Sequence, residues 1–124
     1  MKRDMDLVRE ILIAIEDAPF DGGPLKLTAP VQYSSEQVTY HIMLLHEAGL
    51  IRAFDFSSDD FPDWRPGYLT WEGHEFLNAA RDSGRWNKAK ALVMGKGGGL
   101  VFEVLKQVLL DQMKRHVFGS GNPS

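Results

Sequence analysis

The residues of this 124-residue chain that are suited to chemistry do not fall at a familiar catalytic spacing. The four histidines are His41, His46, His74 and His116. None lies three or four residues from another histidine, the helical spacing at which two imidazoles share a metal ion. His41 and His46 are five residues apart, which puts them on different faces of a helix. No metal site is therefore predicted.

Catalytic groups show no recognisable order either. A nucleophile, a base and an orienting acid do not occur in any recognisable order along the chain. There is also no Gly-x-Ser-x-Gly turn and no signature of paired carboxylates. The chain has no cysteine, which excludes disulfides, thiolate metal ligands and a thiolate nucleophile. Glu72 and Glu75 flank His74 at a helix start, where acids favourably oppose the helix dipole. We expect a protein that is not an enzyme, with no catalytic residues and no cofactor.

A glycine-rich segment, Gly95-Lys96-Gly97-Gly98-Gly99, offers backbone N–H groups and a lysine that an anion could use. It lacks the spacing and the Lys-Ser/Thr ending of a nucleotide-binding P-loop. We interpret it instead as a flexible connection that lets the last helix swing out or exchange between chains.

The residues best suited to nucleic acid lie in an expected helix over residues 35–48 and around it. Base contacts are expected from Gln37, Tyr40 and His41, with Thr39 as a weaker candidate, and phosphate contacts from Arg52, Arg65, Lys88 and Lys90. The local charge opposes this, because residues 34–68 hold six acidic residues and two arginines, a net charge of -4. Neutralisation of phosphates supplies most non-specific affinity, so a DNA-reading surface should be positive.

Aromatic residues gather around an expected hairpin and the helices after it: Phe61, Trp64, Tyr68, Trp71 and Trp86. In a domain of this size most of them should complete the core, because a small core needs large side chains. Phe61 and Trp64 differ, since they stand among prolines and aspartates in the loop of the hairpin. We expect these two to contact a protein partner.

The last expected helix, over residues 100–117, has a wide apolar face, and Leu110 falls among the charged residues opposite that face. A partner helix that buries a second patch would explain both features, which predicts a homodimer or a docking helix. The alternative is that this helix simply packs on the first helix.

Periodicity and capping residues predict the elements that position these groups. A first helix over residues 4–17, capped by Asp4, carries Val8, Ile11, Leu12 and Ile15 on one face and ends before Pro19. Only a short strand near residues 25–28 fits between the prolines and glycines that follow. Ser34 or Ser35 then caps a helix that ends at Gly49 and buries Val38, Ile42 and Leu45.

The second half of the pattern is a hairpin followed by helices. Strands are expected at residues 50–56 and 68–70, around a turn-rich loop over residues 57–67. Thr70 is placed to cap a third helix that buries Phe76, Leu77 and Ala80 and ends near Asp82, and a further helix is expected over residues 86–94.

Composition and charge fit one ordinary domain. The chain is 44% hydrophobic and 25% charged, and its net charge of -3 combines -8 in residues 1–80 with +5 in residues 81–124. Such asymmetry orients a protein on an anionic partner or lets its two ends attract each other in an oligomer. The longest apolar stretch near the N-terminus, residues 11–15, is too short for a secretory signal or a membrane span. We expect a cytoplasmic protein that does not enter a membrane.

Several segments are similar to an uncharacterised domain-of-unknown-function family of short bacterial and phage proteins. They are the opening MKRDMDLVREIL, residues 40–51, LTWEGHEFL at residues 69–77, WNKAK at residues 86–90 and Gly97-Gly98-Gly99-Leu100. That family has no known activity, so the resemblance implies no site residue. More loosely, Glu47-Ala48-Gly49-Leu50-Ile51 and the turn from Leu69 to Gly73 resemble winged-helix transcription regulators, although the positioning helix of a helix-turn-helix is missing.

The sequence thus predicts an α+β, winged-helix-like domain over residues 1–82, in the order helix, short strand, helix, two-stranded wing and helix. Residues 83–118 should form C-terminal helices that pack on it or mediate dimerisation, and residues 119–124 a disordered tail. The expected function is that of a non-enzymatic regulatory protein, DNA-binding and of the transcription-regulator kind. The alternative is a protein-interaction module or adaptor that does not bind nucleic acid directly.

Overall fold

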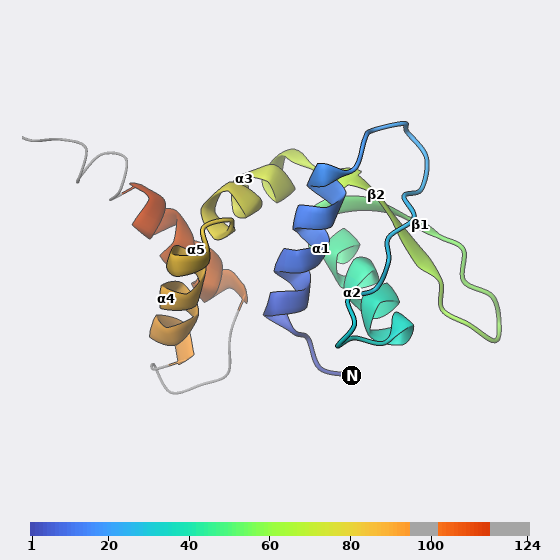
Figure 1. Ribbon diagram of the computed structural model, residues 1–124, viewed down its shortest axis with the longest axis horizontal. Coiled ribbons are helices and arrows are strands. Elements are labelled where there is room, and N and C mark those ends of the chain that lie inside the picture. The colour runs from blue at the N-terminus through green and yellow to red at the C-terminus, as the bar shows by residue number, and fades with distance from the viewer. Residues whose placement is uncertain (95–101, 115–124) are drawn as a thin grey trace, which may run out of the picture. The chain divides into compact units, whose positions relative to one another are not determined.

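The computed structural model describes residues 1–94 and 102–114. The described elements follow one another as α1 (Met5–Asp17), α2 (Ser35–Glu47), β1 (Ile51–Asp55), β2 (Trp64–Leu69), α3 (Trp71–Ala80), α4 (Ser83–Met94) and α5 (Phe102–Lys114). This is an α+β fold with a two-stranded antiparallel hairpin, which we call the wing (Figure 1). The chain divides into two compact units, Met1–Glu75 and Phe76–Ser124, so the division falls inside α3 and not after it.

Helix α1 begins as its sequence predicts. The carboxylate of Asp4 accepts hydrogen bonds from the backbone N–H groups of Asp6 (2.9 Å) and Leu7 (3.3 Å), which caps the helix. The predicted apolar face is buried and extends to the first turn: Met5, Leu7, Val8, Ile11, Leu12 and Ile15. The helix ends at Asp17, and its C-cap Ala18 adopts an extended conformation before Pro19.

Helix α2 has a capping box. The Ser34 hydroxyl accepts from the Gln37 N–H (3.1 Å), and the Gln37 side-chain carbonyl accepts from the Ser34 N–H (2.8 Å). Gly49 follows the helix with φ +77°, a conformation that glycine adopts without strain. The buried face holds the predicted Val38, Ile42 and Leu45, together with His41, and α2 contacts both α1 and the wing (Figure 1).

The wing contains a bulge. Arg52 pairs with Tyr68 and Ala53 pairs with Pro66, which leaves Gly67 as the extra residue of β2. A Cβ at Gly67 would lie 2.8 Å from the Arg52 carbonyl oxygen and 3.0 Å from the Phe54 ring. The bulge therefore requires glycine, because the two strands approach each other closely there.

The short strand predicted near residues 25–28 does not form, and that prediction was wrong. Residues 24–29 run extended beside β2, joined to it by a hydrogen bond from the Leu25 N–H to the Pro66 carbonyl (2.7 Å). Pro66 has no N–H to donate in return, so a ladder cannot continue at this position. As expected, no helix lies between α1 and α2, a stretch that the structure describes completely.

The junction between β2 and α3 packs against the turn between α2 and β1. The Thr70 hydroxyl accepts from the Gly73 N–H (3.1 Å), as the predicted N-cap should, and donates to the Gly49 carbonyl (2.6 Å). The Thr70 N–H donates to the Leu50 carbonyl (3.0 Å). A Cβ at Gly73 would overlap that same carbonyl oxygen, so only glycine lets the helix approach this closely.

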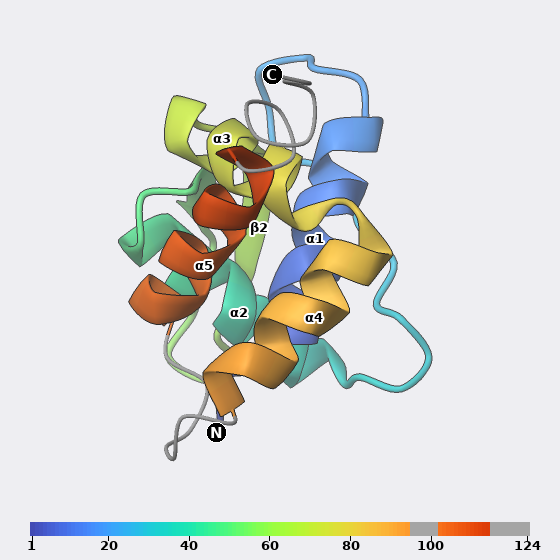
Figure 2. The same ribbon diagram turned by 90° about the vertical axis from the view of Figure 1, so that its left-hand side faces the viewer.

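In the second unit, α4 packs against α5 (Figure 2). The Phe76 ring contacts the rings of Trp86 (centroids 6.3 Å apart) and Phe102 (5.1 Å), and Trp86 is buried as expected. Trp71 and Tyr68 are exposed, so the expectation that they complete the core was wrong. Helix α4 begins three residues before the predicted start, because the Asp82 carboxylate accepts from the Arg85 N–H (2.8 Å) and caps it.

Three predictions concern residues outside the described ranges: the connection at residues 95–99, the two ends of the last helix and the tail at 119–124. Among the described residues, no helix combines the length and the apolar character that crossing a bilayer requires.

Candidate binding surface on α2 and the wing

A groove of about 630 Å³ lies between the extended segment 24–29, helix α2 and strand β2. Its volume falls within the roughly 300–1,000 Å³ that is usual for ligand pockets. Most of the lining is apolar, from Pro24, Leu25, Leu27, Ala29, Val38, Ile42, Trp64 and Pro66. The polar residues of the lining are Lys26, Ser35, Thr39, Asp63 and Arg65. An apolar surface with a few polar groups suits a peptide or another small apolar ligand.

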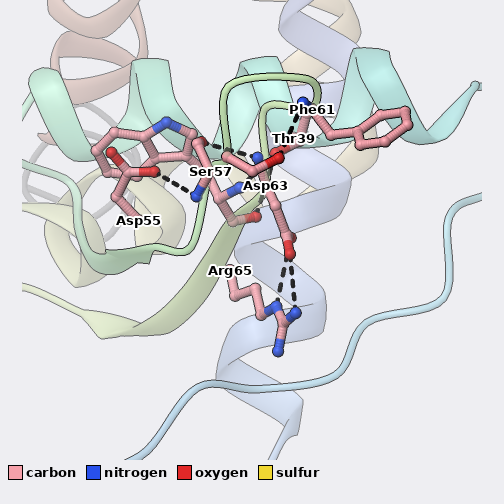
Figure 3. Close-up of polar contacts among 8 residues, drawn as sticks. Thr39, Asp55, Ser57, Phe61, Asp63 and Arg65 are labelled. Carbon is pink, nitrogen blue, oxygen red and sulfur yellow. Dashed lines mark hydrogen bonds and ion pairs between the residues drawn. The ribbon is translucent and has the colours of Figure 1, made fainter.

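Strand β2 is fastened to α2 beside this groove. The Thr39 hydroxyl accepts from the Trp64 N–H (2.5 Å) and lies 3.4 Å from the Trp64 carbonyl, to which it donates (Figure 3). The Trp64 ring packs against His46 (centroids 5.4 Å apart), and His46 Nδ1 accepts from the Ala53 N–H (3.1 Å). The wing is thereby held at a fixed position on the helix.

The loop at the tip of the wing, residues 56–63, is organised by its own hydrogen bonds although it forms no regular element. The Asp55 carboxylate accepts from the Ser57 N–H (2.9 Å), and the Ser57 hydroxyl accepts from the Asp63 N–H (2.9 Å). The Phe61 N–H donates to the Ser58 hydroxyl (3.2 Å). The Phe61 ring points away from the other labelled residues and is 71% exposed (Figure 3).

Charge on the wing is mainly negative. Asp63 and Arg65 form a two-pronged ion pair (2.8 and 3.3 Å; Figure 3). The Arg65 guanidinium also lies 4.5 Å from the centre of the Phe56 ring. The hydrogen bond from Arg65 holds the pKa of Asp63 below its ordinary value, and that from Ser57 lowers the pKa of Asp55. Both carboxylates therefore stay ionised at neutral pH.

The structure changes the roles of the residues expected to contact bases. His41 is fully buried: its Nε2 accepts from the Asp4 N–H (2.7 Å) and its Nδ1 lies 2.7 Å from the Gln37 carbonyl. It cannot reach a base edge, which corrects that expectation. Gln37 is half-buried and uses its side chain in the capping box. Tyr40 is half-buried, with its ring edge against His41 (centroids 5.8 Å apart).

The residues expected to contact phosphates are divided between the two units. Arg52 on β1 and Arg65 on β2 are exposed in the first unit. Arg65 already forms an ion pair with Asp63 and a cation–π contact with Phe56. Lys88 and Lys90 lie on α4 in the second unit, where the Lys90 amine is 5.6 Å from the centre of the Trp86 ring. Two of these four cations thus belong to each unit.

Of the residues expected to contact protein, Phe61 is exposed and Trp64 is half-buried as one wall of the groove. Leu110 is half-buried on α5 in the second unit. The contribution of Leu25 and Leu27 to the groove was not predicted, because residues 25–28 were expected only as a short strand between the prolines and glycines. Their alternation with Lys26 and Thr28 is the signal that could have indicated it, since an extended chain directs residues two apart to one side.

Within the described ranges, no group of three or more histidine, aspartate or glutamate side chains is placed to hold a metal ion. The site is thus built from an apolar groove, a rigid acidic wing and one protruding phenylalanine. These features define a small α+β protein with a wing and an open groove.

The chain belongs to the family described as "Hypothetical protein (DUF2513)", whose model matches residues 2–99. It is 39% identical over 116 residues to an uncharacterized protein of Haemophilus influenzae, an alignment that covers 91% of this chain and 98% of the relative. No solved structure matches the chain. These findings confirm the resemblance to an uncharacterised family.

Proposed function

We propose that this chain is a non-enzymatic regulatory protein that binds a protein partner through the groove and through Phe61. The groove is the observation that carries the proposal, because it leaves apolar side chains of the segment 24–29 and α2 accessible beside an ordered wing. Apolar pockets next to exposed aromatic side chains are where binding energy concentrates in protein interfaces.

Charge supports a protein partner with basic character. The ion pair neutralises Asp63 and Arg65 together, which leaves Asp55, Asp59 and Asp60 on the wing against Arg52. A partner segment with lysine or arginine beside an apolar anchor would match this potential, and complementary charge raises the rate of encounter.

DNA binding is the second candidate, and it is supported by the order of the elements. Helix α2 precedes a hairpin wing, as the recognition helix does in winged-helix regulators. Residues 81–90 also add a basic segment with Arg81, Arg85, Lys88 and Lys90 against Asp82. We place this candidate second, because His41 is buried and the wing would repel phosphates.

Selection of peptides from a displayed random library tests the first candidate. Selected peptides should lose affinity at least about tenfold for Leu27→Asp and Phe61→Ala, since each removes an apolar anchor. Val31→Asp is the matched control, because Val31 is a fully exposed apolar residue that does not line the groove. Peptides that bind all three variants as well as the wild type would contradict the proposal.

A mobility-shift titration with random duplex DNA at low and at higher salt tests the second candidate. DNA binding predicts a salt-sensitive complex that weakens in the double variant Lys88→Gln/Lys90→Gln. Absence of any complex at micromolar protein would remove DNA binding and favour the protein partner.

We further propose a cytoplasmic homodimer formed through the C-terminal helix. Val104 on α5 is exposed and Leu110 is half-buried, which leaves apolar area on this helix for a second copy. Light scattering at high concentration decides the assembly, because a mass near 14.0 kDa would contradict the dimer.

A further inference from the structure

The extended segment 24–29 brings a backbone edge to the groove as well as apolar side chains. Every second side chain of the segment is half-buried along the groove, namely those of Leu25, Leu27 and Ala29. The Leu25 N–H donates to the Pro66 carbonyl on β2. An extended chain directs groups two residues apart to the same side, so the N–H and C=O of Leu27 also face the space between the segment and β2.

These backbone groups of Leu27 have no partner. Among the residues that the structure describes, none accepts from the Leu27 N–H or donates to the Leu27 carbonyl. The facing edge of β2 does not supply one, because the Trp64 N–H and carbonyl contact the Thr39 hydroxyl and Pro66 has no N–H. A ligand that covers Leu27 without pairing with its backbone groups would lose affinity, since unpaired buried groups are costly.

We propose that the occupant of the groove is an extended segment of a partner protein, which adds a strand along residues 25–29. The inference rests on the proposed function and specifies the conformation of the bound partner. A strand pairs its backbone with Leu27 and directs alternate side chains onto the apolar surface of Val38 and Ile42 on α2. A helix uses its own N–H and C=O groups internally, so it would leave those of Leu27 unpaired.

Two features of the groove select the sequence of the bound segment. Pro24 and Pro30 have no N–H, so the backbone donors of this edge all lie between them and the pairing is short. The acidic wing borders the groove through Asp63 and Trp64, which favours a lysine or arginine at that end of the segment. We therefore expect a few alternating apolar residues with a basic residue beside them.

Amide hydrogen exchange, resolved by NMR in the full-length protein, tests the pairing. The probe is the tightest peptide from the displayed random library described above, at saturating concentration. Exchange at the Leu27 amide should slow at least about tenfold, because the new hydrogen bond protects it. Exchange at the Thr28 amide should not change, since that N–H points away from the groove. Equal exchange rates at Leu27 with and without the peptide would overturn the proposal.

N-methylation of the same peptide, one residue at a time, tests its conformation. In a strand only alternate residues pair with Leu27 and its neighbours, so methylation should weaken binding at least about fivefold at every second residue. Methylation of the residues between them should leave the affinity within about twofold. Losses without this alternation would overturn the strand conformation.

A proline at position 27 removes the donor from the protein. Proline is compatible with an extended chain, and Leu27→Pro breaks no hydrogen bond that the described residues make, so the variant should fold with normal stability. Its affinity for the peptide should be at least about fivefold below that of Leu27→Val, which keeps the N–H. Thr28→Pro removes an N–H on the other side and is the matched control. Equal affinities of Leu27→Pro and Leu27→Val would contradict the pairing.

The proposed function and this inference fail in different ways. If no selected peptide discriminates against Leu27→Asp, the groove is not the binding site and both are wrong. If a peptide depends on the Leu27 side chain but shows neither amide protection nor alternation, the groove remains the binding site and only the strand conformation is wrong.

Discussion

The hydroxyl of Thr39 in the middle of α2 holds the backbone of Trp64 at the start of β2. It accepts from the Trp64 N–H and donates to the Trp64 carbonyl, across 25 residues of sequence. Both groups lie at the edge of β2 that does not pair with β1. Thr39 therefore supplies the hydrogen bonds that the backbone of a further strand would make at this point. One side chain thereby sets the position of the wing and one wall of the groove.

Replacing Thr39 with valine keeps the shape of the side chain and removes both hydrogen bonds. We expect a loss of about 1–3 kcal/mol in the free energy of unfolding, because the partly buried Trp64 N–H loses its partner. Thr28→Val is the matched control on an exposed threonine and should change stability by less than about 0.5 kcal/mol. Urea denaturation measures both values. Equal stability of the two variants would show that the contact does not hold the wing.

Gly73 provides a steric test of the fold. Because a Cβ at this position overlaps the Leu50 carbonyl oxygen, Gly73→Ala must move the start of α3 away from the turn that precedes β1. We expect a loss of about 3 kcal/mol or more in unfolding free energy, at the upper end for overpacking. Gly23→Ala serves as the control, since a Cβ there meets only the Asp21 side chain at an ordinary 3.6 Å. A Gly73→Ala protein as stable as the control would contradict this close approach.

Much of this fold is predictable from local chemistry. Asp4, Ser34 and Thr70 cap helices in the structure as their positions in the sequence predict, because a cap depends on residues within one turn. The failure at residues 25–28 is non-local: the strand does not form because Pro66, about forty residues later, has no N–H to offer. Hydrophobic alternation predicts an extended chain, but it does not predict the partner that the chain needs.

Burial of His41 has a direct consequence for stability. An imidazole with its proton on Nδ1 donates to the Gln37 carbonyl and accepts from the Asp4 N–H, so it joins α2 to the cap of α1. His41→Leu should cost about 1–3 kcal/mol of unfolding free energy, because the Asp4 N–H loses its acceptor. His74→Leu is the control, because His74 is exposed, and it should be close to neutral. Thermal or chemical denaturation that gives equal losses for both variants would contradict the role of His41.

The candidate site was harder to predict than the fold, and His41 shows why. His41 lies three residues after Val38 and four before Leu45, so helical periodicity places it on the buried face of α2. What periodicity does not report is the partner that satisfies a buried imidazole, because the Asp4 N–H lies 37 residues away in the sequence. The groove likewise depends on an extended segment that lies beside β2 with too few backbone bonds to close the space. Phe61 was predictable because its exposure follows from local loop residues alone.

Tyr33 predicts how stability responds to alkaline pH. Partial burial and the hydrogen bond from its hydroxyl to the Asp4 carboxylate (3.1 Å) raise the pKa of Tyr33 from 10.0 to about 12. The folded state thus favours the protonated phenol. Its contribution is fully present below pH 10.0 and is lost as the pH rises toward about 12.

In the variant Tyr33→Phe this titrating group is absent, whereas the other tyrosines and the lysines remain. Unfolding free energies measured in urea between pH 9 and pH 12 should therefore fall more steeply for the wild type than for Tyr33→Phe, since the unfolded wild type loses its phenolic proton first. The two curves should be parallel below the ordinary tyrosine pKa of about 10. Parallel curves over the whole range would show that the hydroxyl of Tyr33 is not held by Asp4 in solution, and that the cap of α1 is free of this contact.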